Sequence, residues 1–333
     1  MKKSFYIVSF CLFITSFVFT QTIQTEAGTV EFIGLKKWDY IALADTLKAI
    51  DPNGSLHACS AILTTYLNFA DANVFSYEDS GNINTIVTVI EPEDSFRVKY
   101  ESIPPKKYGT PSDWYIILPL LEDRSIIQFG IQFYDKILQD KQDELKSGLE
   151  KFKNLINKDK INLFWNFLDT RKSLENKEDA FRILDSDGNK SNRIIAVALL
   201  SNFPEDEETW LRLINALRDS EPDVRLLAVL VINMFSNSFA RKIDWSPAEK
   251  SLRYLLNGTN LMSFDILIDL LTKTELSPEL GKRLLRNNSE LLFAYLGAEN
   301  ENVKRKADSF LSYLFNRHFK TIDDLNDWLD SNY

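Results

Sequence analysis

The sequence is poor in the residues that most often carry reactive or cross-linking chemistry. Its 333 residues include only two cysteines and two histidines, with 11 glycines and 10 prolines. Two cysteines cannot build a disulfide-rich scaffold, and so few histidines and cysteines leave little for a zinc site of the usual kind. The low glycine and proline content excludes a collagen-like or low-complexity chain.

Basic residues are scarce relative to acidic ones. The chain has 39 Lys and Arg against 48 Asp and Glu, a formal net charge of −9. Because nucleic-acid binding needs clustered positive charge, this balance argues against a nucleic-acid partner. The 44% of hydrophobic residues and 12% of aromatic residues are too many for a disordered chain. The length allows about two domains with cores of their own.

The first twenty residues have the layout of a secretory signal peptide. Lys2 and Lys3 precede an almost wholly apolar run at residues 5–19, and a polar stretch begins at Gln21. A basic start, a short apolar region and a polar boundary are typical of such signals, and the run is shorter than the about 20 residues that cross a bilayer. We expect a signal peptide at 1–20 and export to the periplasm, with secretion or cell-surface display as the alternatives. An uncleaved anchor is the other interpretation, and no later segment approaches membrane-spanning length.

Residues 28–95 show the periodicities of a small α/β module. Period-two alternation indicates strands, and apolar positions three and four apart indicate helices. Strands are predicted at residues 28–34, 73–77 and 83–90, and helices at 39–50 and 55–69. The predicted order is therefore β-α-α-β-β.

Four segments of this module carry a family resemblance. They are Gly34–Trp38, Gly54–Leu56, Leu67–Val74 and Thr85–Glu91. Together they resemble the POTRA domain, the polypeptide-transport-associated module of outer-membrane assembly proteins. In that family the module usually precedes a membrane-embedded domain, whereas this chain continues into helices.

The resemblance implies a protein-binding edge. POTRA modules bind other proteins in the periplasm, partly by adding a strand to an exposed sheet edge. Unpaired backbone groups at such an edge supply the affinity. The resemblance places this edge at Asn73, Val74, Phe75, Ser76 and Tyr77, which are the candidate partner-binding residues.

Helical periodicity replaces alternation from residue 114 onward, after a proline- and glycine-containing stretch at 96–113 that we expect to be a linker. Residues 217–228 and 296–307 share a leucine, an acid-rich turn, a valine, a basic residue and an alanine at an offset of 79. That offset is close to twice the period of about 40 found in two-helix repeats. A further copy begins near Asn192, and a degenerate one is expected at 255–271.

This pattern resembles HEAT-like repeats, in which each helix pair is joined by an Asp-rich turn followed by Val-Arg and then Ala. One pair cannot bury its apolar surface alone, and stacking of neighbouring pairs solves that problem. The resemblance implies an all-α superhelical domain, a HEAT-like α-solenoid, over residues 114–333.

Two histidines and one cysteine are the candidate reactive groups. His57 and Cys59 lie two residues apart, and side chains at that spacing on a helix do not face each other. Cys59 falls on the apolar stripe of its helix, which favours a buried structural thiol. His318 lies near a helix end beside basic residues, where a solvated role suffices.

Three acidic clusters are candidates for metal or acid–base sites. Residues 185–191 have the start of a calcium loop, but Lys190 and Ala196 stand where an EF-hand needs glycine and glutamate. The acidic groups at 91–94 and 323–330 are interpreted as solvated surface. We expect no catalytic, cofactor-binding or metal-ligating residues.

The sequence thus predicts an exported, non-enzymatic scaffold or adaptor that binds unidentified protein partners through a strand edge and a helical-repeat surface. The POTRA resemblance extends this role to cell-envelope assembly. No nucleic-acid partner and no membrane span in the mature chain are expected. The alternatives are a hydrolase-type enzyme with a dispersed carboxylate site in the helical groove, and a structural or inhibitory subunit of an exported complex.

Overall fold

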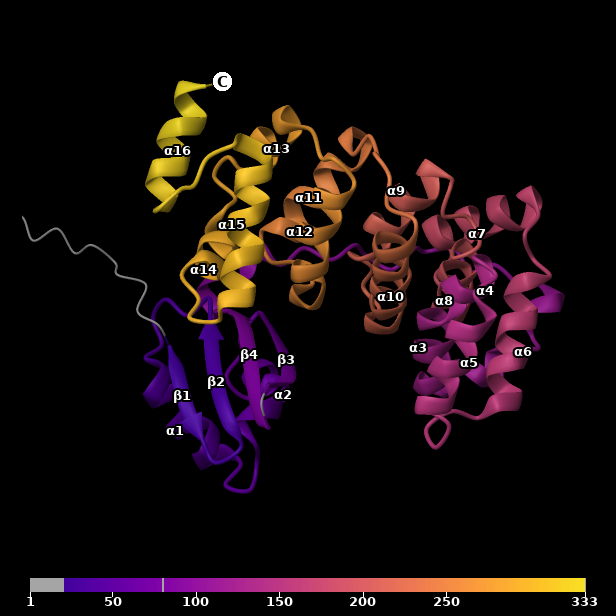
Figure 1. Cartoon of the computed structure of the whole chain (residues 1–333), viewed down its shortest axis with the longest axis horizontal. Coiled ribbons are helices and arrows are strands. Elements are labelled where there is room, and N and C mark those ends of the chain that lie inside the picture. The colour runs from indigo at the N-terminus through magenta and orange to yellow at the C-terminus, as the bar shows by residue number, and fades with distance from the viewer. Residues whose placement is uncertain (1–20, 80, 333) are drawn as a thin grey trace, which may run out of the picture.

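The computed structural model describes residues 21–79 and 81–332, so the predicted signal peptide at 1–20, with Cys11, lies outside the described residues. A small mixed sheet with two short helices is followed by helices up to the C-terminal end (Figure 1). This layout confirms the predicted α+β module followed by a helical region. Among the described residues, no helix is both long and apolar enough to cross a membrane.

Four strands form one sheet in the order β1-β2-β4-β3. Their bounds are Thr22–Thr25 (β1), Gly28–Ile33 (β2), Asp71–Asp79 (β3) and Asn82–Ile90 (β4). The central pair, β2 and β4, is parallel, and each outer strand is antiparallel to its neighbour. The three predicted strands are present. The additional strand β1 carries a single large apolar side chain, Ile23, which gives no alternation to detect.

The helices of the module cover one face of the sheet. Helix α1 (Tyr40–Ile50) is capped as predicted by Asp39, whose carboxylate accepts hydrogen bonds from two backbone N–H groups. The prediction of one helix over 55–69 was wrong, because a 3₁₀ turn, η1 (Leu56–Ala58), precedes a short α2 (Ser60–Thr65). Asn68 has φ of +57°, in the left-handed region, which prevents the helix from continuing.

The other face of the sheet packs against the helical part of the chain. Ile33, Ile86 and Ile90 belong to the same buried cluster as the helices, whereas Val30 and Val87 pack with α1 and α2. Both faces of the two central strands are therefore covered. That burial explains why β4 is buried at nearly every position in its second half.

Residues 92–332 form 3₁₀ turns and helices. The 3₁₀ turns are η2 (Pro92–Arg97), η3 (Ser112–Trp114), η4 (Leu118–Glu122), η5 (Ser246–Ala248) and η6 (Leu261–Ser263). The helices are α3 (Arg124–Gln132), α4 (Tyr134–Leu138), α5 (Gln142–Lys151), α6 (Lys158–Asp169), α7 (Leu174–Ser186), α8 (Lys190–Leu200), α9 (Glu207–Ala216), α10 (Pro222–Ser238), α11 (Glu249–Leu256), α12 (Phe264–Lys273), α13 (Pro278–Leu285), α14 (Glu290–Leu296), α15 (Glu301–Phe315) and α16 (Ile322–Ser331).

Successive helices pack in pairs, and the pairs pack on one another. Contacts join α7 to α8, α9 to α10, α11 to α12 and α14 to α15. The second helices also meet in sequence, because α8 contacts α10, α10 contacts α12 and α12 contacts α15. Ala228 and Ala307, the small residues shared by the two clearest sequence copies, are fully buried in α10 and α15.

The stretch predicted as a linker runs along the turns of these helix pairs, behind α10 and α12 in Figure 1. We call residues 97–110 the strap. The N–H of Lys99 donates to Thr259, at the turn between α11 and α12, and the N–H of Glu101 donates to the carbonyl of Arg218, after α9. Further along, the N–H of Tyr108 donates to Asp187, between α7 and α8. The strap thus contacts three successive turns in reverse order of sequence.

Candidate functional site

The strand β3 forms one edge of the sheet. Within the described part of the chain its only strand partner is β4. It is nine residues long, whereas β1 at the opposite edge has four. Natural proteins protect edge strands by shortness, charged side chains, proline or a covering segment. β3 has no lysine and no proline, its start contacts η6, and Glu78 is its exposed charge. β3 is therefore the edge that is open to pairing.

The five candidate residues Asn73 to Tyr77 lie together in the middle of β3. Their side chains alternate between the two sheet faces, with Asn73, Phe75 and Tyr77 toward the helical part of the chain. Val74 packs into the core of the module on the other face. On that same face the Ser76 hydroxyl lies 2.7 Å from the hydroxyl of Thr85.

The backbone of β3 alternates as well. Asp79 pairs with Asn82 across a two-residue connection, and such a hairpin is closed by a hydrogen-bonded pair. Hydrogen-bonded and non-hydrogen-bonded pairs alternate along an antiparallel ladder. Counting from Asp79, the N–H and C=O groups of Val74, Ser76 and Glu78 point away from β4. These are the groups that an added strand would engage.

A small cavity, which we call the edge pocket, lies beside β3 on the helical side. Its volume is about 130 Å³. It is lined by Phe75, Tyr77 and Ile86 from the sheet and by Asp265, Val303 and Lys306 from α12 and α15, among others.

Phe75 is the exposed part of this pocket wall. Its side chain is 56% exposed and stacks on the ring of Tyr77, with centroids 6.0 Å apart. The Tyr77 hydroxyl is fixed by the side-chain amide of Asn300. At the rim the Lys306 ammonium pairs with Asp265 at 2.6 Å. The pocket lining is thus half apolar and half polar, and its one lysine is paired with its one aspartate.

A buried carboxylate holds α15 against the sheet. Glu31 of β2 accepts hydrogen bonds from the backbone N–H groups of Glu299 and Asn300, the second at 3.0 Å. Burial raises the pKa of Glu31 above its ordinary value, although these two hydrogen bonds oppose the shift. Nearby, the Thr88 and Tyr295 hydroxyls lie 3.1 Å apart. These contacts fix the helical wall of the edge pocket.

A second buried carboxylate anchors the start of β3. Asp71 accepts a hydrogen bond from the Tyr100 hydroxyl at 3.1 Å and lies 3.4 Å from the N–H of Leu261. Burial raises the pKa of Asp71, against the effect of these donors. The guanidinium of Arg225 lies 4.0 Å from the centre of the Tyr100 ring. The first residue of the edge strand is therefore tied to both the strap and the helices.

His57 and Cys59 do not form a reactive pair. The two ring nitrogens of His57 face the hydroxyls of Thr85 and Thr25, and this polar chain ties η1 to the sheet. Cys59 is buried, as predicted, and burial raises the pKa of its thiol to about 11. A thiol with such a pKa is a poor nucleophile at neutral pH.

The loop that resembles a calcium site is occupied by protein donors. Asp187 is fully buried, and its carboxylate accepts hydrogen bonds from the N–H groups of Tyr108 and Asn189 and from the side chain of Asn192. Within residues 21–79 and 81–332, no three His, Cys, Asp or Glu side chains are grouped as metal ligands would be.

The interpretation of residues 91–94 as solvated surface was wrong for Glu91. This side chain is only 2% exposed and accepts hydrogen bonds from the backbone N–H groups of Lys36, Lys37 and Trp38. It closes the turn between β2 and α1. Its donors lie more than fifty positions earlier, so the local sequence gives no sign of them.

A larger groove lies between η4 and helices α3, α8 and α10, with a volume of about 850 Å³. Its lining is mainly aliphatic, with Leu118, Leu226 and Leu230 among its members. At its rim Lys190 pairs with Asp223 at 3.0 Å. This lining suits an apolar ligand better than carboxylate chemistry.

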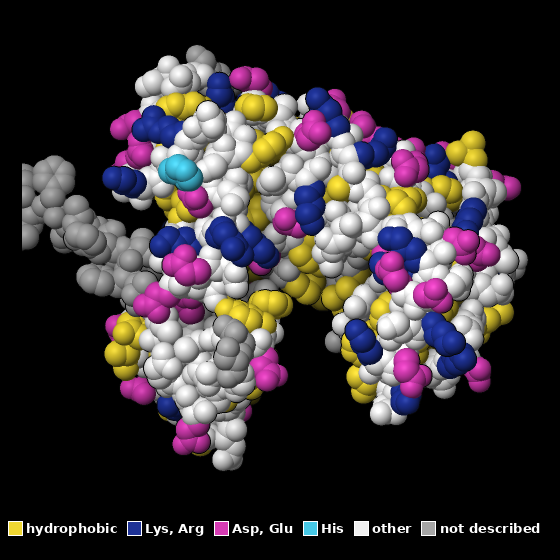
Figure 2. Space-filling view, viewed as in Figure 1, with side chains coloured by type: hydrophobic (Ala, Val, Ile, Leu, Met, Phe, Trp, Pro, Cys, Tyr) yellow, Lys and Arg dark blue, Asp and Glu magenta, His cyan; other side chains and the backbone are white. Residues whose placement is uncertain are grey.

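Hydrophobic side chains also face a wide notch between the sheet module and the helices on the right of the view (Figure 2).

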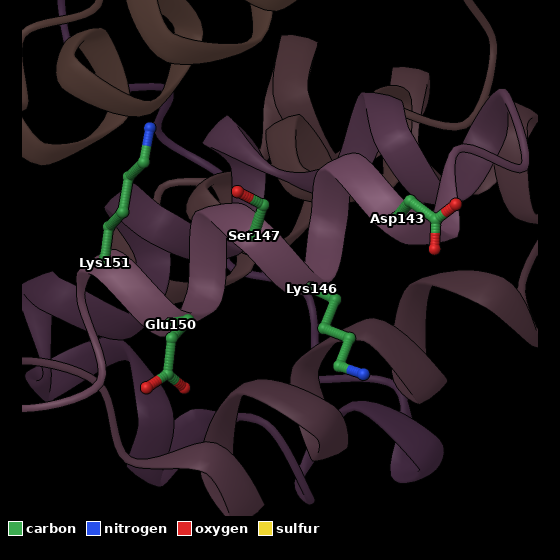
Figure 3. A pocket seen from close by; sticks show the side chains of 5 residues that line it. All are labelled: Asp143, Lys146, Ser147, Glu150 and Lys151. Atoms are coloured by element: carbon green, nitrogen blue, oxygen red, sulfur yellow. The ribbon is translucent and has the colours of Figure 1, made fainter.

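Besides the edge pocket and the groove, a shallow depression lies on α5. Asp143, Lys146 and Glu150 project from a single helix and point away from one another (Figure 3). Side chains from one helix face cannot surround a ligand.

The chain matches no family model, no curated protein and no solved structure.

Proposed function

We propose that this chain is an exported, non-enzymatic scaffold that binds protein partners by strand addition at β3 and through its helical surface. In this proposal residues 28–95 act as a POTRA-like module and residues 114–333 as a HEAT-like α-solenoid. The biological setting that this likeness suggests is assembly in a cell envelope.

The observation that carries the proposal is the long open edge of β3. Nine residues of backbone, without lysine or proline, have strand pairing on one side. An edge of this kind is an aggregation hazard unless a partner covers it. Its side chains are held in place by Asp71 at one end and by Tyr77 at the other, so the edge is rigid before binding. Rigidity lowers the entropy cost of association.

The helix packing supports the second half of the proposal. Each second helix contacts the second helix of the next pair, as expected for stacked repeats. The groove beside α10 and the notch in Figure 2 give this part of the molecule concave apolar surface. Contiguous exposed apolar surface of this kind marks interaction sites.

The test is partner capture from the native envelope with the exported chain and a Val74→Pro variant. Proline removes the outward N–H of residue 74 and blocks strand addition there without removing a bond to β4. Val74→Thr, which keeps the N–H and the β-branched shape, is the matched control. Circular dichroism confirms that each variant folds.

We expect crosslinked partners to be lost with Val74→Pro and retained with Val74→Thr. If the proline at 74 unfolds the module, Glu78→Pro at the exposed end of the same edge replaces it. Retention of the same partners by the folded proline variant would refute strand addition. Sequencing of the exported protein's N-terminus tests the signal peptide, with a start near Gln21 expected.

A further inference from the structure

We propose that the occupant of β3 is an extended segment of a partner protein with alternating apolar and basic side chains, whose central apolar residue fills the edge pocket. The proposal rests on strand addition at β3 as the proposed function. It adds the chemistry of the partner and the position of its anchor.

The apolar half of this pattern follows from the pocket beside the edge. A strand added to β3 places its side chains directly opposite those of β3 and on the same face. A residue opposite Phe75 therefore projects toward the helical side, where Phe75, Ile86 and Val303 line about 130 Å³ of space. An apolar cavity of about 150 Å³ holds a benzene ring, so this pocket suits one large apolar side chain.

The wall of the edge pocket that α15 supplies favours an apolar partner residue opposite Phe75. Val303 and Lys306 come from α15, which Glu31 and Tyr77 hold at the sheet. The Lys306 ammonium is neutralised by Asp265, so no unpaired charge at this pair opposes an apolar side chain. Phe75, exposed at its outer side, gives an aromatic surface for the incoming residue.

The basic half follows from the charge of the module. No lysine or arginine occurs between Lys48 and Arg97, and this stretch contains seven acidic residues. One of them, Glu78, is exposed on β3 itself, whereas Asp71 at the start of the strand is buried. Complementary charge steers association and favours a basic partner strand.

The two halves fall on opposite faces of the added strand. Glu78 is exposed and shares its face with Ser76 and Val74, away from the edge pocket. Basic side chains on that face lie opposite Glu78 and the polar Ser76. The partner strand therefore alternates, with basic residues on one face and an apolar anchor on the other.

The test uses the full exported chain and a fluorescent synthetic peptide, Lys-Thr-Lys-Phe-Lys-Thr-Lys, with blocked ends. Fluorescence polarisation measures its affinity. The comparison peptides replace the four lysines by glutamate, replace phenylalanine by serine, or carry N-methyl groups on alternate backbone nitrogens. Hydrogen exchange at the amides of residues 74 and 76 reports whether a strand is added.

The expected result is binding of the lysine–phenylalanine peptide with protection of those amides. Binding should weaken about tenfold with the serine peptide or with Phe75→Ser, which removes the aromatic contact. It should weaken about fivefold with Glu78→Lys and fall with added salt. Glu205→Lys makes the same charge change on an exposed residue before α9 and should leave the affinity unchanged.

Different outcomes refute different statements. Absent binding of this peptide, or equal binding of the glutamate or serine peptide, overturns the inferred partner chemistry. Strand addition itself survives that result if Val74→Pro still abolishes partner capture. Binding that is insensitive to N-methylation and to Val74→Pro overturns strand addition at β3, and the inference with it.

Discussion

Arg193 joins two turns of the helical region, and its replacement gives a sharp test of the structure. The side chain is completely buried at the start of α8. Its guanidinium donates to both carboxylate oxygens of Asp219, at 2.8 and 2.9 Å, and to the carbonyl of Asp187 at 2.7 Å. Arg193→Met keeps much of the volume but leaves the nearly buried Asp219 carboxylate without its cation. Removing one partner of a buried ion pair costs about 3–5 kcal/mol of unfolding free energy.

Urea unfolding followed by circular dichroism measures this loss. For large domains 1 kcal/mol corresponds to about 2–4 °C in melting temperature, so a fall of at least about 6 °C is also expected. The matched control is Arg182→Met, because Arg182 pairs with Asp179 at 2.8 Å while both side chains are about half exposed. An exposed pair of this kind contributes about 0–1 kcal/mol.

Equal stability of Arg193→Met and Arg182→Met would refute this reasoning. A second variant separates the unpaired charge from the loss of packing. Arg193→Met combined with Asp219→Leu removes both charges, and apolar replacement of a whole buried pair is often neutral. We expect the double variant to recover part of the stability lost by Arg193→Met. A double variant less stable than Arg193→Met would show that the unpaired Asp219 is not the cause.

Three other changes have defined outcomes. Because burial raises the pKa of Glu31 above 4.5, its contribution to stability is complete below pH 4.5 and is lost as the pH rises through the folded-state pKa. Urea unfolding at stepped pH should therefore show the wild type losing stability relative to Glu31→Gln, and a gain would contradict the raised pKa. Iodoacetamide at pH 8 should label Cys59 only after unfolding, because its thiol is buried with a pKa of about 11. Peptide mass spectrometry measures the labelling, and labelling of the native protein would contradict the burial. Gly258→Ala should cost about 1–3 kcal/mol, since Gly258 has φ of +126° and a Cβ there would lie 2.7 Å from Ile90. Gly109→Ala, with open space around it, should cost less than about 0.5 kcal/mol, and equal thermal shifts for the two alanine variants would refute the strain argument.

Periodicity predicted the elements whose burial is one-sided or complete. The alternation in β4 and the nearly all-apolar surface of α10 are strong signals, and both elements are present. The helix predicted over 55–69 is divided into η1 and a short α2, and His57 of η1 bonds to side chains of two strands, which a helical pattern cannot reveal. Glu91 was misplaced for the same reason, since its donors at residues 36–38 are distant in sequence.

The candidate site was predictable only in part. The segment Asn73 to Tyr77 follows from alternation and from a family resemblance, and the structure places it on the edge strand. The edge pocket could not be predicted, because its walls come from residues 75–86 and from residues 265–306. Sequence periodicity specifies which face of an element is apolar, and it does not specify which distant element covers that face.

The packing of the sheet against α14 and α15 sets an order of events during synthesis. Ile33, Ile86 and Ile90 leave the ribosome first, while residues that pack against this face follow much later, from Gly258 beside Ile90 to Tyr295 of α14 beside Thr88. Contacts of such long sequence separation slow folding, and the apolar face of the sheet stays uncovered until the chain is nearly complete. This delay would serve the export that we propose, because a sheet face that closes only when α15 arrives keeps the chain from completing its fold before translocation.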